Sequence, residues 1–165
     1  MKKKTAMFMG VLLVAMIGLV FGQGDVYYTV AFAAETTTQA PGISVTEDEL
    51  DILRRIVWAE ARGEDEKGMI LVVNVIMNRM ECPRFPNSIE SVVFQPRQFS
   101  PVRNGAFARA QPCARVDQAV EQALRGRDYA QGAVFFRMIE GAQGQWHERD
   151  LTPLFDHGTH RFYDW

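Results

Sequence analysis

The sequence has no excess of basic charge. Its 18 Lys and Arg residues are outnumbered by 20 Asp and Glu residues, which gives a formal net charge of −2 at pH 7. Loss of residues 1–33 would remove three lysines and one aspartate, so the remainder would carry about −4. Nucleic-acid-binding proteins present basic surfaces, so this balance argues against a nucleic-acid partner. It also argues against simple electrostatic adhesion to an anionic envelope.

Cysteine and metal-site motifs are equally sparse. If the chain is exported, as its first residues indicate, the pair Cys82 and Cys113 predicts a disulfide, and two free thiols are the alternative. His157 and His160 have the spacing His-x-x-His, not the His-Glu-x-x-His of zinc peptidases, so we expect no metal and no other cofactor. Cys113 lacks the flanking motif of a cysteine-peptidase nucleophile.

Residues 1–33 are typical of a secretory signal peptide. Lys2 to Lys4 precede an uncharged, apolar stretch from Thr5 to Gly22, and Ala31-Phe32-Ala33 is a small-x-small tripeptide. This order predicts cleavage near Ala33 and export to the cell envelope or the extracellular medium. An uncleaved membrane anchor is the alternative, because the 18 residues of the apolar stretch are near the minimum that spans a bilayer. Residues 34–45 predict a flexible linker.

Residues 46–165 show the periodicity of one small, mostly helical domain. A first helix is predicted from Thr46, which forms a capping-box pattern with Glu49, to a stop near Gly63. A second, over about 65–80, is apolar on almost every side, which is typical of a helix buried in the middle of a domain. The prediction is completed by a short helix through 94, an ordered loop over 95–105, a long helix over 115–125, and short strands at 133–136 and 160–163. This is an α+β fold with a minor β-sheet.

Glu60 occupies an unexpected position for a charged residue. It follows Leu53, Ile56 and Val57 at helical spacing and therefore lies on the apolar stripe of the first helix. A carboxylate among apolar side chains is costly unless it is paired or protonated, and burial raises its pKa. The general acid of a glycosidase needs such a raised pKa. The alternative is a structural ion pair with Arg62, Arg79 or Arg97.

The segment Trp58-Ala59-Glu60-Ala61-Arg62-Gly63-Glu64 resembles the SleB/CwlJ type of cell-wall hydrolase, which includes the catalytic domains of spore cortex-lytic enzymes. The resemblance implies a lysozyme-like α+β fold over 46–165 and cleavage of peptidoglycan between N-acetylmuramic acid and N-acetylglucosamine. The sequence departs from the family at 134–138, where many relatives have an aromatic-aromatic-Asn-Pro step. The other matching segments are Asn78-Arg79, Phe85-Pro86-Asn87-Ser88-Ile89, Val92-Val93-Phe94-Gln95-Pro96, Gln98-Phe99-Ser100-Pro101-Val102 and His160-Arg161-Phe162-Tyr163.

The same resemblance assigns the catalytic carboxyl to Glu60, which helix geometry indicates independently. It favours a lytic transglycosylase, in which the 6-hydroxyl of the substrate attacks the anomeric carbon and one Glu acts as acid and then as base. Glu64 is the alternative second carboxylate of a two-carboxylate glycosidase. Sugars need hydrogen bonds and flat apolar surface, although core packing is the alternative for each aromatic residue. The expected substrate-binding residues are Gln95, Gln98, Phe99, Ser100, Glu64 and Tyr163.

Two other functions stay open from the sequence alone. A metal-dependent peptidoglycan amidase or peptidase would use His157 and His160, and a non-catalytic wall-binding module would keep the fold without the reaction. Glu60 argues against the binding module, because such a module gains nothing from a costly buried acid. In each case the expected partner is peptidoglycan, and we expect the chain to be a monomer.

Overall fold

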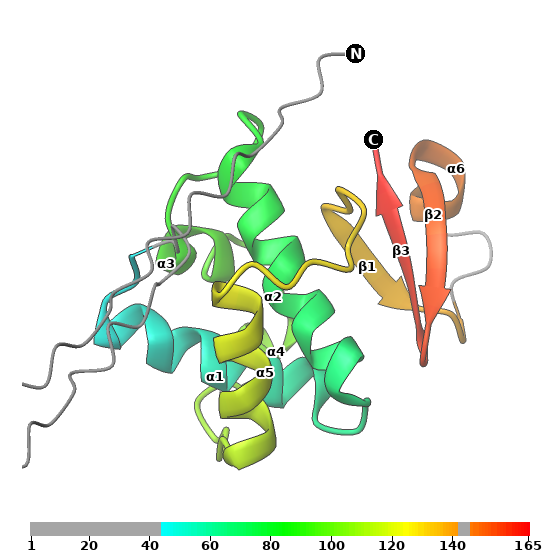
Figure 1. Cartoon of the computed structure of the whole chain (residues 1–165). Coiled ribbons are helices and arrows are strands. Elements are labelled where there is room, and N and C mark those ends of the chain that lie inside the picture. Colours follow the sequence, from blue (N-terminus) through cyan, green and yellow to red (C-terminus); the bar gives the residue numbers. More distant parts are fainter. Residues whose placement is uncertain (1–43, 142–145) are drawn as a thin grey trace, which may run out of the picture. The chain divides into compact units, whose positions relative to one another are not determined.

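The computed structural model describes residues 44–141 and 146–165, so the predicted signal peptide and most of the predicted linker lie outside the described residues (Figure 1). No helix within these ranges is long and apolar enough to cross a membrane. The elements, in chain order, are α1 (Glu47–Ala61), α2 (Glu66–Glu81), α3 (Ile89–Val93), α4 (Ser100–Asn104), α5 (Ala114–Leu124), β1 (Phe135–Met138), α6 (Trp146–Asp150), β2 (Thr152–His157) and β3 (His160–Asp164).

α2 is buried on two faces, between the other long helices and the sheet (Figure 1). Ile70, Val73 and Ile76 pack in the main core with residues of α1, α3 and α5. Leu71 and Val75 instead pack with Phe162 of β3. The almost complete apolarity of 69–77 therefore reflects burial on both faces, and the prediction of a helix in the middle of the domain is confirmed.

The first helix begins at the residue that its capping pattern predicts, and the second begins within a residue of the predicted position. Thr46 accepts a hydrogen bond from the backbone N–H of Glu49, whose carboxylate accepts from the N–H of Thr46, so the capping box is complete. Asp65 caps α2 through a 2.8 Å bond from the N–H of Gly68. Leu53, Ile56 and Val57 are fully buried, which confirms the apolar stripe of α1.

The strands form one antiparallel sheet in the order β1-β3-β2. Phe135 of β1 pairs with Tyr163, and His157 of β2 pairs with His160 across a tight hairpin. The strands predicted at 133–136 and 160–163 correspond to β1 and β3, and the α+β class is confirmed. The sequence analysis missed β2 and α6, and α4 replaces part of the predicted loop. β2 is an exposed edge strand, so it lacks the apolar run or alternation that marks a strand in sequence.

The predicted disulfide is wrong, because both cysteines are free in the structure. Cys82 closes the C-terminal end of α2, whereas Cys113 precedes α5. Arg115, two residues further on, donates a 3.0 Å bond to the carbonyl of Glu64, at the opposite end of α2. The two cysteines therefore lie near opposite ends of α2, and a helix of 16 residues is about 24 Å long (Figure 1). A disulfide requires the two Cα atoms to lie within about 7 Å of each other.

We therefore expect two thiols in the unreduced protein. Exposed Cys113 should react with a thiol reagent in the folded state, and half-buried Cys82 should react more slowly. The measurement is thiol titration before and after denaturation, without reductant, with Cys113→Ser to identify the fast thiol. Finding no reactive thiol in denaturant would contradict this arrangement.

Candidate active site

A groove of about 1010 Å³ opens beside the last turn of α1. Its walls come from the α1–α2 junction, from the segment 97–106 that includes α4, from β1, and from the turn between β2 and β3. The groove brings together five of the residues predicted for the site, and it places Gln98 and Glu60 on the same cavity. These five are Glu60, Glu64, Gln98, Phe99 and Ser100.

The Glu60 carboxyl is half-buried in this groove, and it forms no hydrogen bond or ion pair with any residue of the described ranges. Burial raises the pKa of Glu60 to about 7, although the positive charge of Arg79 opposes the shift. The structural ion pair considered from the sequence is thus not formed. At neutral pH, Glu60 exists in comparable amounts as acid and carboxylate, which suits a group that must donate and accept a proton.

Arg79 supplies the buried positive charge near Glu60. Its side chain is only 3% exposed, and its Nε donates a 2.7 Å hydrogen bond to the carbonyl of Val134. The guanidinium lies 5.1 Å from the ring centres of both Phe85 and Phe99. Burial lowers the pKa of Arg79 to about 10, against the influence of Glu60. Arg79 is therefore charged at neutral pH and stabilises the ionised form of Glu60.

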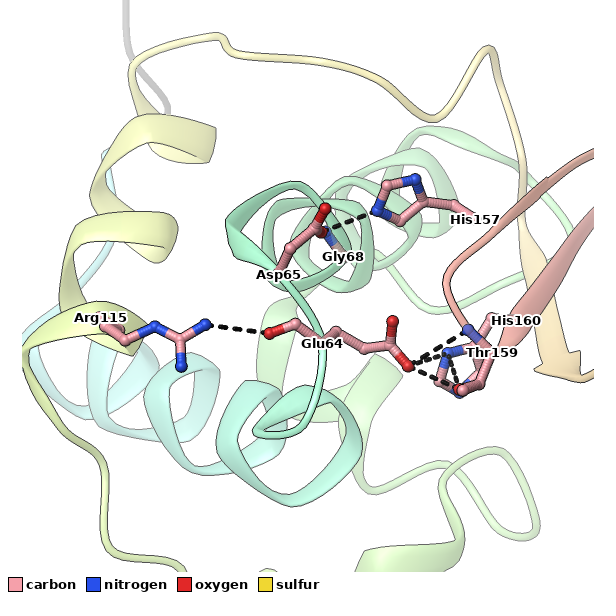
Figure 2. Close-up of polar contacts among 7 residues, drawn as sticks. All are labelled: Glu64, Asp65, Gly68, Arg115, His157, Thr159 and His160. Carbon is pink, nitrogen blue, oxygen red and sulfur yellow. Dashed lines mark hydrogen bonds and ion pairs between the residues drawn. The ribbon is translucent and has the colours of Figure 1, made fainter.

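Glu64 is occupied by contacts that join the β2–β3 turn to the α1–α2 junction (Figure 2). Its Oε1 accepts a 2.5 Å bond from the hydroxyl of Thr159 and lies 3.5 Å from Nδ1 of His160. The Glu64 side chain is only 11% exposed. A carboxylate held in this way is poorly placed to activate water or attack a sugar.

Asp65 makes a second contact of the same kind (Figure 2). Its Oδ1 lies 2.8 Å from Nε2 of His157 and accepts from the N–H of Gly68. These hydrogen bonds, led by that of His157, lower the pKa of Asp65. Two adjacent acidic residues thus contact the two histidines that flank the hairpin turn. Within 44–141 and 146–165, no three His, Cys, Asp or Glu side chains are grouped as a metal site would require.

Two of the predicted substrate-binding residues lie off the groove. Tyr163 is fully buried, and its hydroxyl donates a 2.5 Å hydrogen bond to Glu148, so it belongs to the core. Gln95 is half-buried but does not line the cavity. Phe99 reaches the groove wall but is only 3% exposed, because it packs in the main core and against Arg79. Among the loop residues proposed from sequence, Gln98 and Ser100 therefore offer the accessible polar groups.

Three parts of the groove wall were not predicted from the sequence: β1, α6 and the β2–β3 turn. The side chains of β1 and the β2–β3 turn join it through tertiary packing, and no local pattern marks them. α4 is short, and its Pro101 was interpreted as a loop signal although proline is also favoured in the first turn of a helix. The missed lining residues with polar side chains are Arg103, Asn104, Arg137, Glu140, His147, Thr159 and His160.

Comparison with known proteins agrees with this fold. The profile of the Cell Wall Hydrolase family matches residues 63–163. The spore cortex-lytic enzyme of Bacillus subtilis (strain 168) is 33% identical over 99 residues, which cover 60% of this chain and 32% of that protein. The cell wall hydrolase CwlJ of the same organism is 30% identical over 129 residues, 73% of this chain and 88% of the relative.

A solved structure, the catalytic domain of the germination-specific lytic transglycosylase SleB from Bacillus anthracis, superposes with a TM-score of 0.67 at 27% identity. The match covers 73% of this chain and 98% of that domain. The chain thus has the α+β fold of that catalytic domain. The chain belongs to the Cell Wall Hydrolase family. It spans about a third of the length of the Bacillus subtilis spore cortex-lytic enzyme.

The hairpin contact generates a prediction for Gly158. Its φ of 55° is in the left-handed region, and a Cβ there would overlap the Glu64 carboxylate. Gly158→Ala should therefore displace the end of the Glu64 side chain from Thr159, and it should cost more than the roughly 1 kcal/mol of the backbone conformation alone. Gly132→Ala is the matched control, because Gly132 also has a positive φ but has open space around it. Equal free energies of unfolding for the two variants would contradict the Glu64 contact.

The raised pKa of Glu60 predicts a pH-dependent stability. Because the folded-state pKa is about 7 and the ordinary value is 4.5, the native state loses stability as pH rises from about 4.5 through 7. Glu60→Gln stays neutral, so it should match the wild type at pH 4 and be more stable at pH 8, by up to about 3 kcal/mol. Chemical denaturation at both pH values measures this. A Glu90→Gln control, on an exposed carboxylate, should show no such gain. If the free energy of unfolding of Glu60→Gln differs from that of the wild type by the same amount at pH 4 and at pH 8, the shift is refuted.

Proposed function

We propose that this chain cleaves the glycan strand of peptidoglycan between N-acetylmuramic acid and N-acetylglucosamine, as a lytic transglycosylase with Glu60 as its single acid–base. One observation carries the proposal: the groove holds a half-buried, unpaired carboxyl whose pKa of about 7 lets it donate and then accept a proton. Glu64 supports a one-carboxylate mechanism, because its contacts with Thr159 and His160 leave it unavailable as a nucleophile.

The relatives support the same reaction and its setting. The matched SleB domain is described as a germination-specific lytic transglycosylase, and several sequence relatives are spore cortex-lytic enzymes. Cortex peptidoglycan is therefore the first substrate to test. Peptidoglycan lies outside the cytoplasmic membrane, so the proposal requires export, which residues 1–33 would direct.

The reaction divides into two proton transfers at one carboxyl group. Protonated Glu60 first donates its proton to the glycosidic oxygen as the bond between that oxygen and the anomeric carbon breaks. The 6-hydroxyl oxygen of the muramic acid then bonds to the anomeric carbon, and its proton passes to the Glu60 carboxylate. The product is a 1,6-anhydro sugar, no water is consumed, and Glu60 returns to its starting state. Arg79 stabilises the carboxylate between the two steps.

Substitution of Glu60 should abolish the reaction without unfolding the protein. Glu60→Gln keeps the size of the side chain but removes the proton, so turnover should fall by about a hundredfold or more. The measurement is mass spectrometry of fragments released from purified peptidoglycan, where wild-type protein should produce anhydro-muramic ends. Near-normal turnover by folded Glu60→Gln would end the proposed role.

The products also distinguish the alternative mechanism. Reducing ends would indicate hydrolysis, which requires a second carboxylate. Glu140, which is exposed on the groove beyond β1, is the candidate for that role. Under the proposed mechanism, Glu140→Gln should leave anhydro products and their rate within a few fold of the wild type. New amino groups in place of new sugar ends would instead identify an amidase or peptidase.

A further inference from the structure

The groove is rich in arginine although the whole chain is slightly acidic. Five arginines line it, against three glutamates. One of the five is buried Arg79, and the other four are on its rim and walls: Arg62, Arg97, Arg103 and Arg137. Within the described residues, none of the five has a carboxylate oxygen within the 4.0 Å of an ion pair. The guanidinium groups of this groove thus form no ion pair with a carboxylate of the described residues.

Many arginines elsewhere on the molecule have carboxylate partners. Arg55 and Arg125, for example, pair with Asp51 and Glu121 on their own helices. Arg54, Arg149 and Arg161 likewise contact carboxylates. Outside the groove, five arginines have a carboxylate partner among the described residues, whereas in the groove none of the five does. The arginines outside the groove that also lack such a partner are Arg84, Arg109, Arg115 and Arg127.

Two of the groove arginines make no side-chain contact with the residues that the structure describes. Arg62 stacks over the ring of Trp58 at 4.6 Å, and Arg137 donates to the carbonyl of Gly141 at 2.9 Å. Arg97 and Arg103 have no hydrogen bond, ion pair or aromatic contact with the described part of the chain. Both belong to the groove wall that carries Gln98 and Ser100. They are the charges most available to a ligand.

The backbone at Arg97 gives a second, independent indication. Gln98 donates to the carbonyl of Gln95 across a turn in which Arg97 has a φ of 70°. Glycine is the residue that this conformation favours, because a Cβ there is crowded by the neighbouring backbone. An exposed arginine in this place has no compensating contact within the fold. Conformational strain of this kind is concentrated at functional sites.

We propose that Arg97 and Arg103 bind a carboxylate carried by the glycan strand, which places an anionic substituent beside the bond that Glu60 cleaves. The proposal rests on the proposed function and names the substrate more closely. Sugar rings without charge require hydrogen bonds and stacking, whereas the planar, always-charged guanidinium matches a carboxylate in geometry and charge. The strand offers two sources: free carboxylates of its peptide stems, and the lactyl carboxylate of muramic acid where the stem has been removed.

Binding can be measured without cleavage in full-length protein that carries Glu60→Gln. Arg97→Gly relieves the backbone strain, so the melting temperature should stay equal or rise while affinity for fluorescent glycan strands falls by about two- to fivefold, as for a solvent-exposed ion pair. Adding Arg103→Gln should weaken binding further. Arg125→Ala, on α5, removes one positive charge away from the groove and should leave affinity unchanged.

Three strand preparations identify the ligand: strands with intact stems, strands stripped of stems, and strands whose carboxylates are converted to amides. The loss on Arg97→Gly should vanish on the amidated strands. Its persistence on stripped strands would identify the lactyl carboxylate, and its restriction to intact strands would identify the stem. The inference is overturned if Arg97→Gly has no effect, if the loss is the same on amidated strands, or if Arg125→Ala weakens binding equally. If wild-type protein cuts none of these strands, the proposed reaction is wrong, but the binding result still holds.

Discussion

The burial of α2 on two faces is the constraint on which the remaining structure depends. Because Ile70 and Val73 face the helical core while Leu71 and Val75 face the sheet, α1, α5 and β3 must all pack around one central helix. The loop before α2 joins it to the end of α1 that carries Glu60, and buried Arg79 lies near the other end of α2. The groove is formed where elements packed on the two sides of α2 meet, so its geometry follows from the central helix.

Local sequence patterns predicted the helices that are marked by caps or apolar residues close together in the chain. The capping box at Thr46 and the apolar run of α2 are encoded within a few residues, and the structure has α1, α2 and α5 within one or two residues of the predicted bounds. β2 and α6 are held by exposed or nonlocal contacts and carry no comparable pattern. The false disulfide shows the same limit, since two cysteines in a sequence carry no information about the helix length that separates them.

The sequence indicates a site residue most clearly where that residue is unfavourable for the stability of the fold. Glu60 was identified because a carboxyl on an apolar stripe has no structural reason to be there. Tyr163 was assigned wrongly because an aromatic side chain serves equally well in a core, and its true environment depends on the sheet. Glu64 was ambiguous for a different reason: its partners Thr159 and His160 are almost a hundred residues away in sequence and reach it only through the hairpin.

A cationic groove opposes the protonation of an acid within it, since nearby positive charge lowers a carboxyl pKa. The two coexist because the charges have different surroundings. Arg62, Arg97 and Arg103 are exposed, and water and salt screen their fields over about 8 Å. Arg79 is buried and acts on Glu60 directly, yet the desolvation of Glu60 outweighs it. The rim can therefore attract an anionic strand while the pKa of Glu60 stays near 7. If the arginines together stabilised the carboxylate more than burial destabilises it, the pKa of Glu60 would lie below its ordinary value. The carboxyl would then hold no proton to donate at neutral pH.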